Sequence, residues 1–281
     1  MAEDPSHSHL GDHHGAHAMH QSGHHDHHDD AAFLETNRNH WNKFAASYSS
    51  EPWQKDMLNK INAFIYANIN WIGVDFVDSA TTFEATDPAQ VRKVRVLDYA
   101  CGPGTITYAL GSHATEYVGI DLSENMVQAY NLRFNPAIKD ANNEDESLNA
   151  HAEIGNLLTT EEPPAAFSGP KYHDFDLVVV GLGFHHFSDV RLAAKRLVER
   201  LRPGGVFLIL DFVTHAMEAE EHPDVKASAN TVAHHGFSEQ ELREIFAEAG
   251  LKDFALGRMG DEVYIRGKSK REPFLARGSK I

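Results

Sequence analysis

The sequence predicts an α/β fold built on a mostly parallel sheet, and three segments support this prediction. Residues 94–104 (VRVLDYACGPG) run from a short apolar strand through a glycine-containing turn into a helix pattern. Residues 117–121 (YVGID) form a second short apolar strand that ends in an acid. Residues 175–180 (FDLVVV) form an apolar run typical of a central parallel strand covered on both faces. Short strands that alternate with helix patterns indicate βαβ units.

The first 32 residues are expected to form a disordered tail rich in His and Asp. Residues 1–30 hold ten of the twenty histidines, six acids and no Lys or Arg, so they bury too little apolar surface to fold. A solvated polar tail is one interpretation. The other is a segment whose paired histidines chelate zinc, nickel or copper. The candidate metal ligands are His13, His14, His24, His25, His27 and His28.

Residues 33–72 are predicted to form two helices. In the first, over 33–49, Trp41, Phe44 and Tyr48 recur at helical spacing. The second follows Glu51-Pro52 and carries an aromatic and aliphatic stripe, which is more often core than binding surface. The polar residues 73–91 are expected to link these helices to a core that spans residues 92–281.

The turn after the first core strand predicts a ligand site. A strand that turns through glycines into a helix places backbone N–H groups at the carboxyl edge of the sheet, where open α/β sheets bind ligands. Asp121 ends the next strand, and its carboxylate has two oxygens that can accept both hydroxyls of a ribose. A nucleoside cofactor is therefore expected at this edge.

The rest of the chain continues the alternation of strands and helices. The expected elements are a helix capped by Ser123, a strand at 151–154, an amphipathic helix at 189–200, a turn at 201–205 (LRPGG), a fifth strand at 206–210, an inserted segment at 214–235, a helix with a capping box at Ser238, and short strands at 254–256, 263–265 and 274–276.

Two cofactor classes fit these observations. The first class is a nicotinamide cofactor, as in an oxidoreductase. Its glycine fingerprint requires a third small residue at position 107, where this chain has Thr107, so this alternative is disfavoured but stays open. The other class rests on five motifs in order, which resemble those of the class I S-adenosylmethionine (SAM)-dependent methyltransferases, in particular the UbiE-like branch (methyltransferase type 11/25-like). These motifs are 98–104 (DYACGPG), 121–126 (DLSENM), 175–187 (FDLVVVGLGFHHF), 201–205 (LRPGG) and 236–251, and the resemblance runs from about residue 33 to the end.

This resemblance implies a Rossmann-like, seven-stranded, mostly parallel sheet with an antiparallel last strand, helices on both faces and an N-terminal helical cap at 33–72. It implies SAM as the cofactor, with Gly102–Gly104 at the methionine end, Asp98 near the amino group and Asp121 on the ribose. The family usually has an aspartate at Asn156, so a weaker adenine contact through the Asn carbonyl is expected. The expected cofactor-binding residues are Asp98, Ala100, Cys101, Gly102, Gly104, Asp121, Leu122, Met126, Asn156, Leu157 and Gly181.

Two histidines at the carboxyl end of the 175–180 strand are the catalytic candidates. His185 and His186 can accept a proton near neutral pH, so either can act as general base toward an oxygen or nitrogen nucleophile, and we favour His186. In the alternative, one ring packs and caps the next helix while the other lines the pocket. Tyr48 and Phe212 are the expected substrate-pocket residues.

Composition bounds the function. The net charge of −16 disfavours a nucleic-acid partner, and the single cysteine excludes a disulfide within the chain and disfavours thiol-rich arsenite methylation. No signal peptide or membrane span is recognised, so a cytoplasmic, possibly also nuclear, protein is expected. The expected activity is methyl transfer to an O or N acceptor, with a small molecule favoured and a histone-type protein as second choice. The alternative is a methyltransferase-like regulatory subunit that acts through a protein partner.

Overall fold

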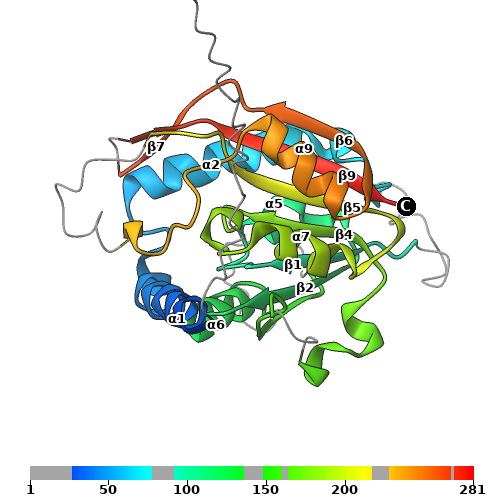
Figure 1. The fold of residues 1–281 in the computed structure, drawn as a ribbon, viewed down its shortest axis with the longest axis horizontal. Coiled ribbons are helices and arrows are strands. Elements are labelled where there is room, and N and C mark those ends of the chain that lie inside the picture. The colour runs from blue at the N-terminus through cyan, green and yellow to red at the C-terminus, as the bar shows by residue number, and fades with distance from the viewer. Residues whose placement is uncertain (1–26, 78–91, 136–147, 160–163, 217–227, 267–268) are drawn as a thin grey trace, which may run out of the picture.

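The computed structural model describes residues 27–77, 92–135, 148–159, 164–216, 228–266 and 269–281 (Figure 1). Their centre is a seven-stranded sheet in the order β3-β2-β1-β4-β5-β9-β6. The strands are β1 (Arg95–Tyr99), β2 (Glu116–Asp121), β3 (Ala150–Ile154), β4 (Phe175–Gly181), β5 (Leu201–Phe212), β6 (Leu251–Arg258) and β9 (Pro273–Lys280).

The pairing confirms the mostly parallel sheet with an antiparallel last strand. β1, β2, β3, β4 and β5 pair in parallel, whereas β9 runs antiparallel to both β5 and β6. The expectation for residues 263–265 needs a correction, because β7 (Val263–Ile265) pairs with β8 (Ser269–Arg271) in a separate hairpin outside the main sheet. Residues 201–205, predicted as a turn, are part of β5. The pairing of β5 with β4 shifts register in this region.

Helices cover both faces of the sheet (Figure 1). Alternate residues of β1 face opposite sides, as the two-residue period of a strand requires. Leu97 and Tyr99 pack with α7 (Val190–Val198) and α9 (Glu239–Glu248). Val96 packs on the other side with α2 (Pro52–Ala67), α3 (Ile69–Ile72) and α5 (Thr105–Leu110). Because both faces are covered, the residues of the central strands are mostly apolar and buried.

The helix starts follow the capping signals of the sequence. Ser123 caps α6 (Glu124–Arg133) by accepting a hydrogen bond from the Met126 N–H, and Ser238 caps α9 by accepting one from the Glu241 N–H. Glu51 and Gln54 form the reciprocal capping box that starts α2.

The first helix starts earlier than predicted. α1 runs over His27–Phe44 and the 3-10 turn η1 over Ala45–Ser47, so residues 27–32 of the predicted disordered tail are helical. The helical pattern of Trp41 and Phe44 therefore extends toward the N-terminus, past the boundary that composition alone suggested. Within the described residues, no helix is long and apolar enough to span a membrane.

Candidate active site

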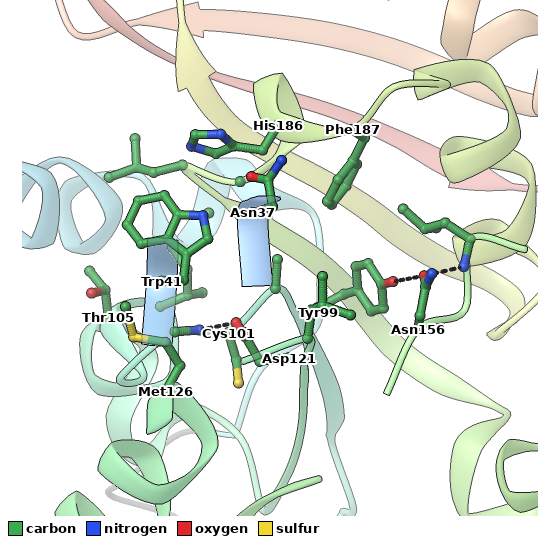
Figure 2. Close-up of a pocket in the computed structure, with 18 of the residues that line it drawn as sticks. Asn37, Trp41, Tyr99, Cys101, Thr105, Asp121, Met126, Asn156, His186 and Phe187 are labelled. Carbon is green, nitrogen blue, oxygen red and sulfur yellow. Dashed lines mark hydrogen bonds between the residues drawn. The ribbon is translucent and has the colours of Figure 1, made fainter. Parts of the chain in front are cut away.

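A crevice opens where the strand order reverses, between β1 and β4, with about 860 Å³ of empty space. This is the topological switch point at which open α/β sheets bind ligands. We call it the glycine-turn crevice, and Figure 2 shows most of the side chains around it. Its lining residues come from the carboxyl ends of β1, β2 and β4 and from α1: Leu34, Asn37, Trp41, Tyr48, Tyr99, Ala100, Cys101, Gly102, Thr105, Ile106, Asp121, Leu122, Met126, Asn156, Leu158, Gly181, Leu182, Gly183, His186 and Phe187.

The floor of the crevice is backbone that carries small residues. Ala100 and Gly102 have φ values of 54° and 52°, in the left-handed region where side chains are strained. At the end of β4, a Cβ on Gly181 would lie 2.4 Å from Cγ1 of Ile106, so the glycine lets α5 approach the strand. Tight packing on this side brings bare backbone to the cavity wall.

Asp121 lies at the tip of β2, as predicted, and its carboxylate is held by the neighbouring backbone. Oδ2 accepts a hydrogen bond from the Gly102 N–H at 2.8 Å (Figure 2). Oδ1 accepts one from the Ser123 N–H at 2.8 Å. Burial raises the pKa of Asp121, while these donors oppose the rise. Each oxygen keeps a lone pair for a ligand hydroxyl, because a carboxylate has about four acceptor sites.

In Asn156, the free end of the side-chain amide is not the end that the sequence predicted. Its Oδ1 already accepts hydrogen bonds from the Leu158 N–H at 2.9 Å and from the Tyr99 hydroxyl at 3.2 Å (Figure 2). The Tyr99 oxygen in turn accepts from the Leu157 N–H at 3.1 Å. The Asn156 NH₂ group is therefore the end left for a ligand, so this residue can donate to a ring nitrogen rather than accept from an amino group.

α1 forms the roof of the crevice and is fastened to the start of α6. Asn42 Oδ1 accepts a hydrogen bond from the Ser123 hydroxyl at 2.6 Å, and Asn42 Nδ2 donates to Glu124 at 2.7 Å. Arg38 forms an ion pair with the same Glu124. From the same helix, Trp41 and Asn37 project toward the crevice (Figure 2).

Asn37 carries a buried acceptor without a partner among the described residues. The residue is 5% exposed, and its Nδ2 donates to the Phe33 carbonyl at 3.2 Å. Its Oδ1 makes no hydrogen bond. A buried carbonyl oxygen left unpaired destabilises a protein by roughly 1–3 kcal/mol, so a ligand that donates to it would be favoured.

Three residues expected to bind the cofactor do not line the crevice. Asp98 is 1% exposed beneath the turn, where its Oδ2 accepts hydrogen bonds from the Thr107 hydroxyl at 2.8 Å and the Thr107 N–H at 3.3 Å. Gly104 packs against Phe134, and Leu157 is fully buried. These residues shape the turn and the strand ends from behind. Oδ2 of Asp98 is thus engaged by the start of α5, and the expected role of Asp98 near the cofactor amino group stays a prediction.

A second, larger cavity adjoins the crevice, with about 1250 Å³ of empty space. We call it the histidine cavity, because His40, His185, His186, His215 and His235 all line it. Its apolar wall includes Phe44, Trp53, Met57 and the predicted pocket residue Phe212. Four residues belong to both cavities: Trp41, Tyr48, Leu182 and His186. The two spaces therefore meet at one wall, which includes the predicted pocket residue Tyr48.

His185 lines the histidine cavity, and a buried carboxylate holds its ring in place. Its Nδ1 lies 2.8 Å and 3.0 Å from the two carboxylate oxygens of Asp211, which has no exposed surface. The same carboxylate accepts hydrogen bonds from the backbone N–H groups of His185 and Phe212. A carboxylate at Nδ1 makes that nitrogen the donor, so Nε2 is left as the proton acceptor.

His186 lies in the shared wall, with its ring edge-on to Trp41 at a centroid separation of 5.1 Å. Its Nδ1 lies 2.5 Å from the Thr231 carbonyl oxygen, which makes Nδ1 the donor. Burial, and then the neighbouring His185, lower the pKa of His186 well below 6.5. This ring therefore stays neutral at physiological pH.

The predicted metal ligands of the tail cannot be placed as a site. His13, His14, His24 and His25 lie outside the described residues, and His27 and His28 form the first turn of α1. In the ranges the structure covers, no group of three or more His, Cys, Asp or Glu side chains is arranged to hold a metal ion.

Three residues of the site were not predicted from the sequence, namely Asp211, Asn37 and Asn42. Asp211 was recognisable as an acid at a strand end, but its partner His185 depends on the pairing of β4 with β5. Asn37 and Asn42 face the crevice and α6 from α1, and nothing in their local sequence marks them.

Comparisons with known proteins agree with this geometry. A family model described as a methyltransferase domain matches residues 75–256. An uncharacterised methyltransferase of Schizosaccharomyces pombe is 27% identical over 198 residues, which are 66% of this chain and 66% of that protein. A demethylmenaquinone methyltransferase of Clavibacter sepedonicus is 27% identical over 143 residues, which are 51% of this chain and 50% of that one. The chain thus spans between half and two thirds of these relatives.

Solved structures share the fold. Magnesium protoporphyrin IX methyltransferase of Synechocystis PCC 6803, crystallised with bound SAH, matches with a TM-score of 0.57. The match covers 89% of this chain and 100% of that one, at 12% sequence identity. At this identity the likeness concerns the architecture of the chain.

Proposed function

Since this chain belongs to the methyltransferase domain family, we propose that it transfers the methyl group of SAM to an oxygen or nitrogen atom of a small molecule. The observation that carries the proposal is the wall shared by the glycine-turn crevice and the histidine cavity. SAM occupies the first space and the acceptor the second. The methyl group passes where the two spaces meet, beside Trp41, Tyr48, Leu182 and His186.

The residues of the crevice fit the cofactor. The two remaining lone pairs of Asp121 suit the two ribose hydroxyls, and Leu122 and Met126 offer an apolar surface for the adenine ring. The free NH₂ of Asn156 suits a ring nitrogen of adenine. The unpartnered Oδ1 of Asn37 suits a donor such as the ammonium group of the methionine part.

Bound SAM supplies a methyl group on a positively charged sulfur, which an in-line nucleophile displaces. The chain's part is to align the acceptor and to exclude water. Trp41 and Tyr48 stand in the shared wall, so the aromatic rings of α1 and the segment after it close the space between the two cavities. Asn42 keeps this roof in place through its bonds to Ser123 and Glu124.

His185 is the general base of this proposal. Asp211 fixes its tautomer and stabilises the imidazolium that forms when Nε2 takes a proton from the acceptor. His186, which we favoured from the sequence, has a lowered pKa and a carbonyl rather than a carboxylate behind it. It therefore holds a proton less well, and its position suits contact with the acceptor.

A two-step experiment tests the proposal. Calorimetry with SAM, SAH and NADPH is expected to give binding heat with the first two alone. Radiolabelled SAM is then incubated with the purified protein and a cell extract split into small-molecule and protein fractions, with Asp121→Ala as control. We expect label in the small-molecule fraction. Label in protein would indicate a protein acceptor, SAM binding without transfer would indicate a regulatory subunit, and binding of NADPH alone would indicate an oxidoreductase.

A further inference from the structure

The charged groups of the histidine cavity are all potential or permanent cations. Beside its five histidines, the cavity is lined by Arg266 and Arg271, while its described lining residues include no Asp or Glu. This is a marked local exception in a chain with 41 acids against 25 Lys and Arg residues.

Arg266 is available to a ligand. It ends the β7 arm of the hairpin with a φ of 54°, a left-handed conformation that side-chain-bearing residues seldom adopt. Its Nη2 donates to the Ser228 hydroxyl at 3.0 Å. Among the described residues no carboxylate forms an ion pair with it. The guanidinium thus has further N–H groups at the cavity wall and no carboxylate partner within the described part of the chain.

The acids around the hairpin are engaged with other cations. Asp261 and Glu262 form ion pairs with Lys60 and Lys270, respectively. Glu272, next to Arg271, lies 3.5 Å from Arg258 on β6. These pairings direct all three acids toward cations other than Arg266, so none of them forms an ion pair with its guanidinium.

The histidines around the arginines respond to the arginine charges. The pKa of His40 is lowered by burial and then by Arg266. The pKa of His215 is lowered by burial and, among the nearby charges, by Arg271 and His235. Both effects favour neutral rings, so the permanent charge of the cavity is that of the arginines.

We propose that the acceptor is an anion, with an aromatic or other apolar body and a carboxylate or phosphate group held by Arg266 and Arg271. The inference rests on the proposed function, because it takes the histidine cavity as the acceptor site. The planar guanidinium matches both anionic groups with paired hydrogen bonds. Phe44, Trp53 and Met57 provide the apolar surface for the body.

The anionic group and the attacking atom are distinct parts of this acceptor. An anion neutralised by arginine is a weaker nucleophile, whereas a hydroxyl or amino group beside Nε2 of His185 loses its proton as it attacks. The expected acceptors are therefore hydroxy or amino aromatic acids or their phosphate counterparts. Methylation of the carboxylate or phosphate itself, giving its methyl ester, would contradict this assignment.

Binding of matched probes tests the inference without turnover. The full-length protein is saturated with SAH, and calorimetry compares 3-hydroxy-2-naphthoate with its neutral amide, and 2-naphthyl phosphate with 2-naphthol. We expect at least one anionic probe to bind about 10-fold or more tightly than its neutral partner. The preferred pair distinguishes carboxylate from phosphate. If neither anion binds, or if the neutral members bind equally well, the inference is overturned.

Arginine variants show which residue binds the anionic group of the probe. Arg266→Gln is expected to weaken binding of the anionic probe by about 10- to 100-fold and to leave the neutral probe unchanged. Arg266→Lys should lose less, since it keeps the charge. Arg243→Gln removes the same charge from an exposed site on α9, outside the cavity, and should change nothing. Anion binding that survives Arg266→Gln would contradict the proposal.

Two controls separate the possible failures. Melting temperature and SAH affinity establish that Arg266→Gln is folded, and Arg271→Gln is the second variant if it is not. Methylation of a neutral acceptor, with no preference for anions, would overturn this inference and leave the proposed function intact. Selective anion binding that depends on Arg266, with no methyl transfer to any acceptor, would overturn the proposed function instead.

Discussion

His185 Nδ1 lies 2.8 Å from Oδ1 of Asp211, although the two residues are 26 positions apart in the chain. The contact exists because β4 and β5 are neighbours in the sheet, with Gly181 paired to Leu210. Asp211 follows Leu210 directly, and the chain turns back after Gly181 so that His185 reaches it. Burial of the carboxylate and its two backbone donors keep the pair rigid, and Nε2 of His185 is left to face the histidine cavity.

Replacing His185 tests its role as base. His185→Gln is expected to lower kcat by about 10²- to 10⁴-fold, the range typical of general base catalysis, with SAH affinity nearly unchanged. His186→Gln should affect the KM of the acceptor more than kcat, because His186 is a neutral group in the shared wall. Steady-state kinetics and calorimetry measure both effects. Equal losses of kcat in the two variants would contradict the assignment.

Asp121 is expected to govern cofactor affinity. Asp121→Asn keeps the shape of the side chain but replaces one acceptor oxygen with a donor, which faces a backbone N–H or a ribose hydroxyl. SAH binding should weaken by about 10- to 100-fold, as expected for losing hydrogen bonds to a charged group. Asp253→Asn, an exposed acid on β6 that lines neither cavity, is the matched control. Titration calorimetry with SAH decides, and unchanged affinity in Asp121→Asn would argue against the ribose contact.

The sequence predicted the sheet well because its signals are local. Apolar runs such as 175–180 mark strands covered on both faces, and Ser123 and Ser238 mark helix starts through a side chain and a backbone N–H three residues away. The glycine turn and Asp121 were predicted to meet because adjacent parallel strands end at the same edge, and their hydrogen bond confirms this.

The remaining features depend on contacts between distant segments. Whether Asn156 offers its carbonyl or its NH₂ is decided by the Tyr99 hydroxyl and the Leu158 N–H, which no local pattern reveals. Asp98 carries the motif acid, yet Thr107 engages it from α5 and withdraws it from the crevice. Arg266 reaches the histidine cavity only because β7 pairs with β8 outside the main sheet.

Asp98 is expected to make stability depend on pH. Burial raises its pKa from 3.8 to about 7. Between these values the folded protein keeps a proton that the unfolded chain releases, so the free energy of unfolding falls as pH rises through this window. Urea unfolding of the wild type and Asp98→Asn at pH 4.5, 6 and 7.5 isolates the effect. Between pH 4.5 and 7.5 the wild type should lose about 3 kcal/mol relative to the variant. A difference independent of pH would show that the carboxyl titrates normally.

The two glycines of the turn are expected to respond differently to alanine. Gly104 has a φ of 84°, and a Cβ there would lie 2.3 Å from Cε2 of Phe134, so Gly104→Ala adds overpacking to backbone strain. Gly102 has a φ of 52° with nothing within 4 Å of its Cβ position, so Gly102→Ala adds strain alone. We expect losses in the free energy of unfolding of about 2–5 kcal/mol for Gly104→Ala and about 1–2 kcal/mol for Gly102→Ala.

The two variants should also differ in SAH binding. Because Gly102 lines the crevice and Gly104 does not, the ratio of lost SAH affinity to lost unfolding free energy should be larger for Gly102→Ala. Urea unfolding and calorimetry on both variants measure the two quantities, and equal destabilisation would show that Phe134 yields to the added methyl group.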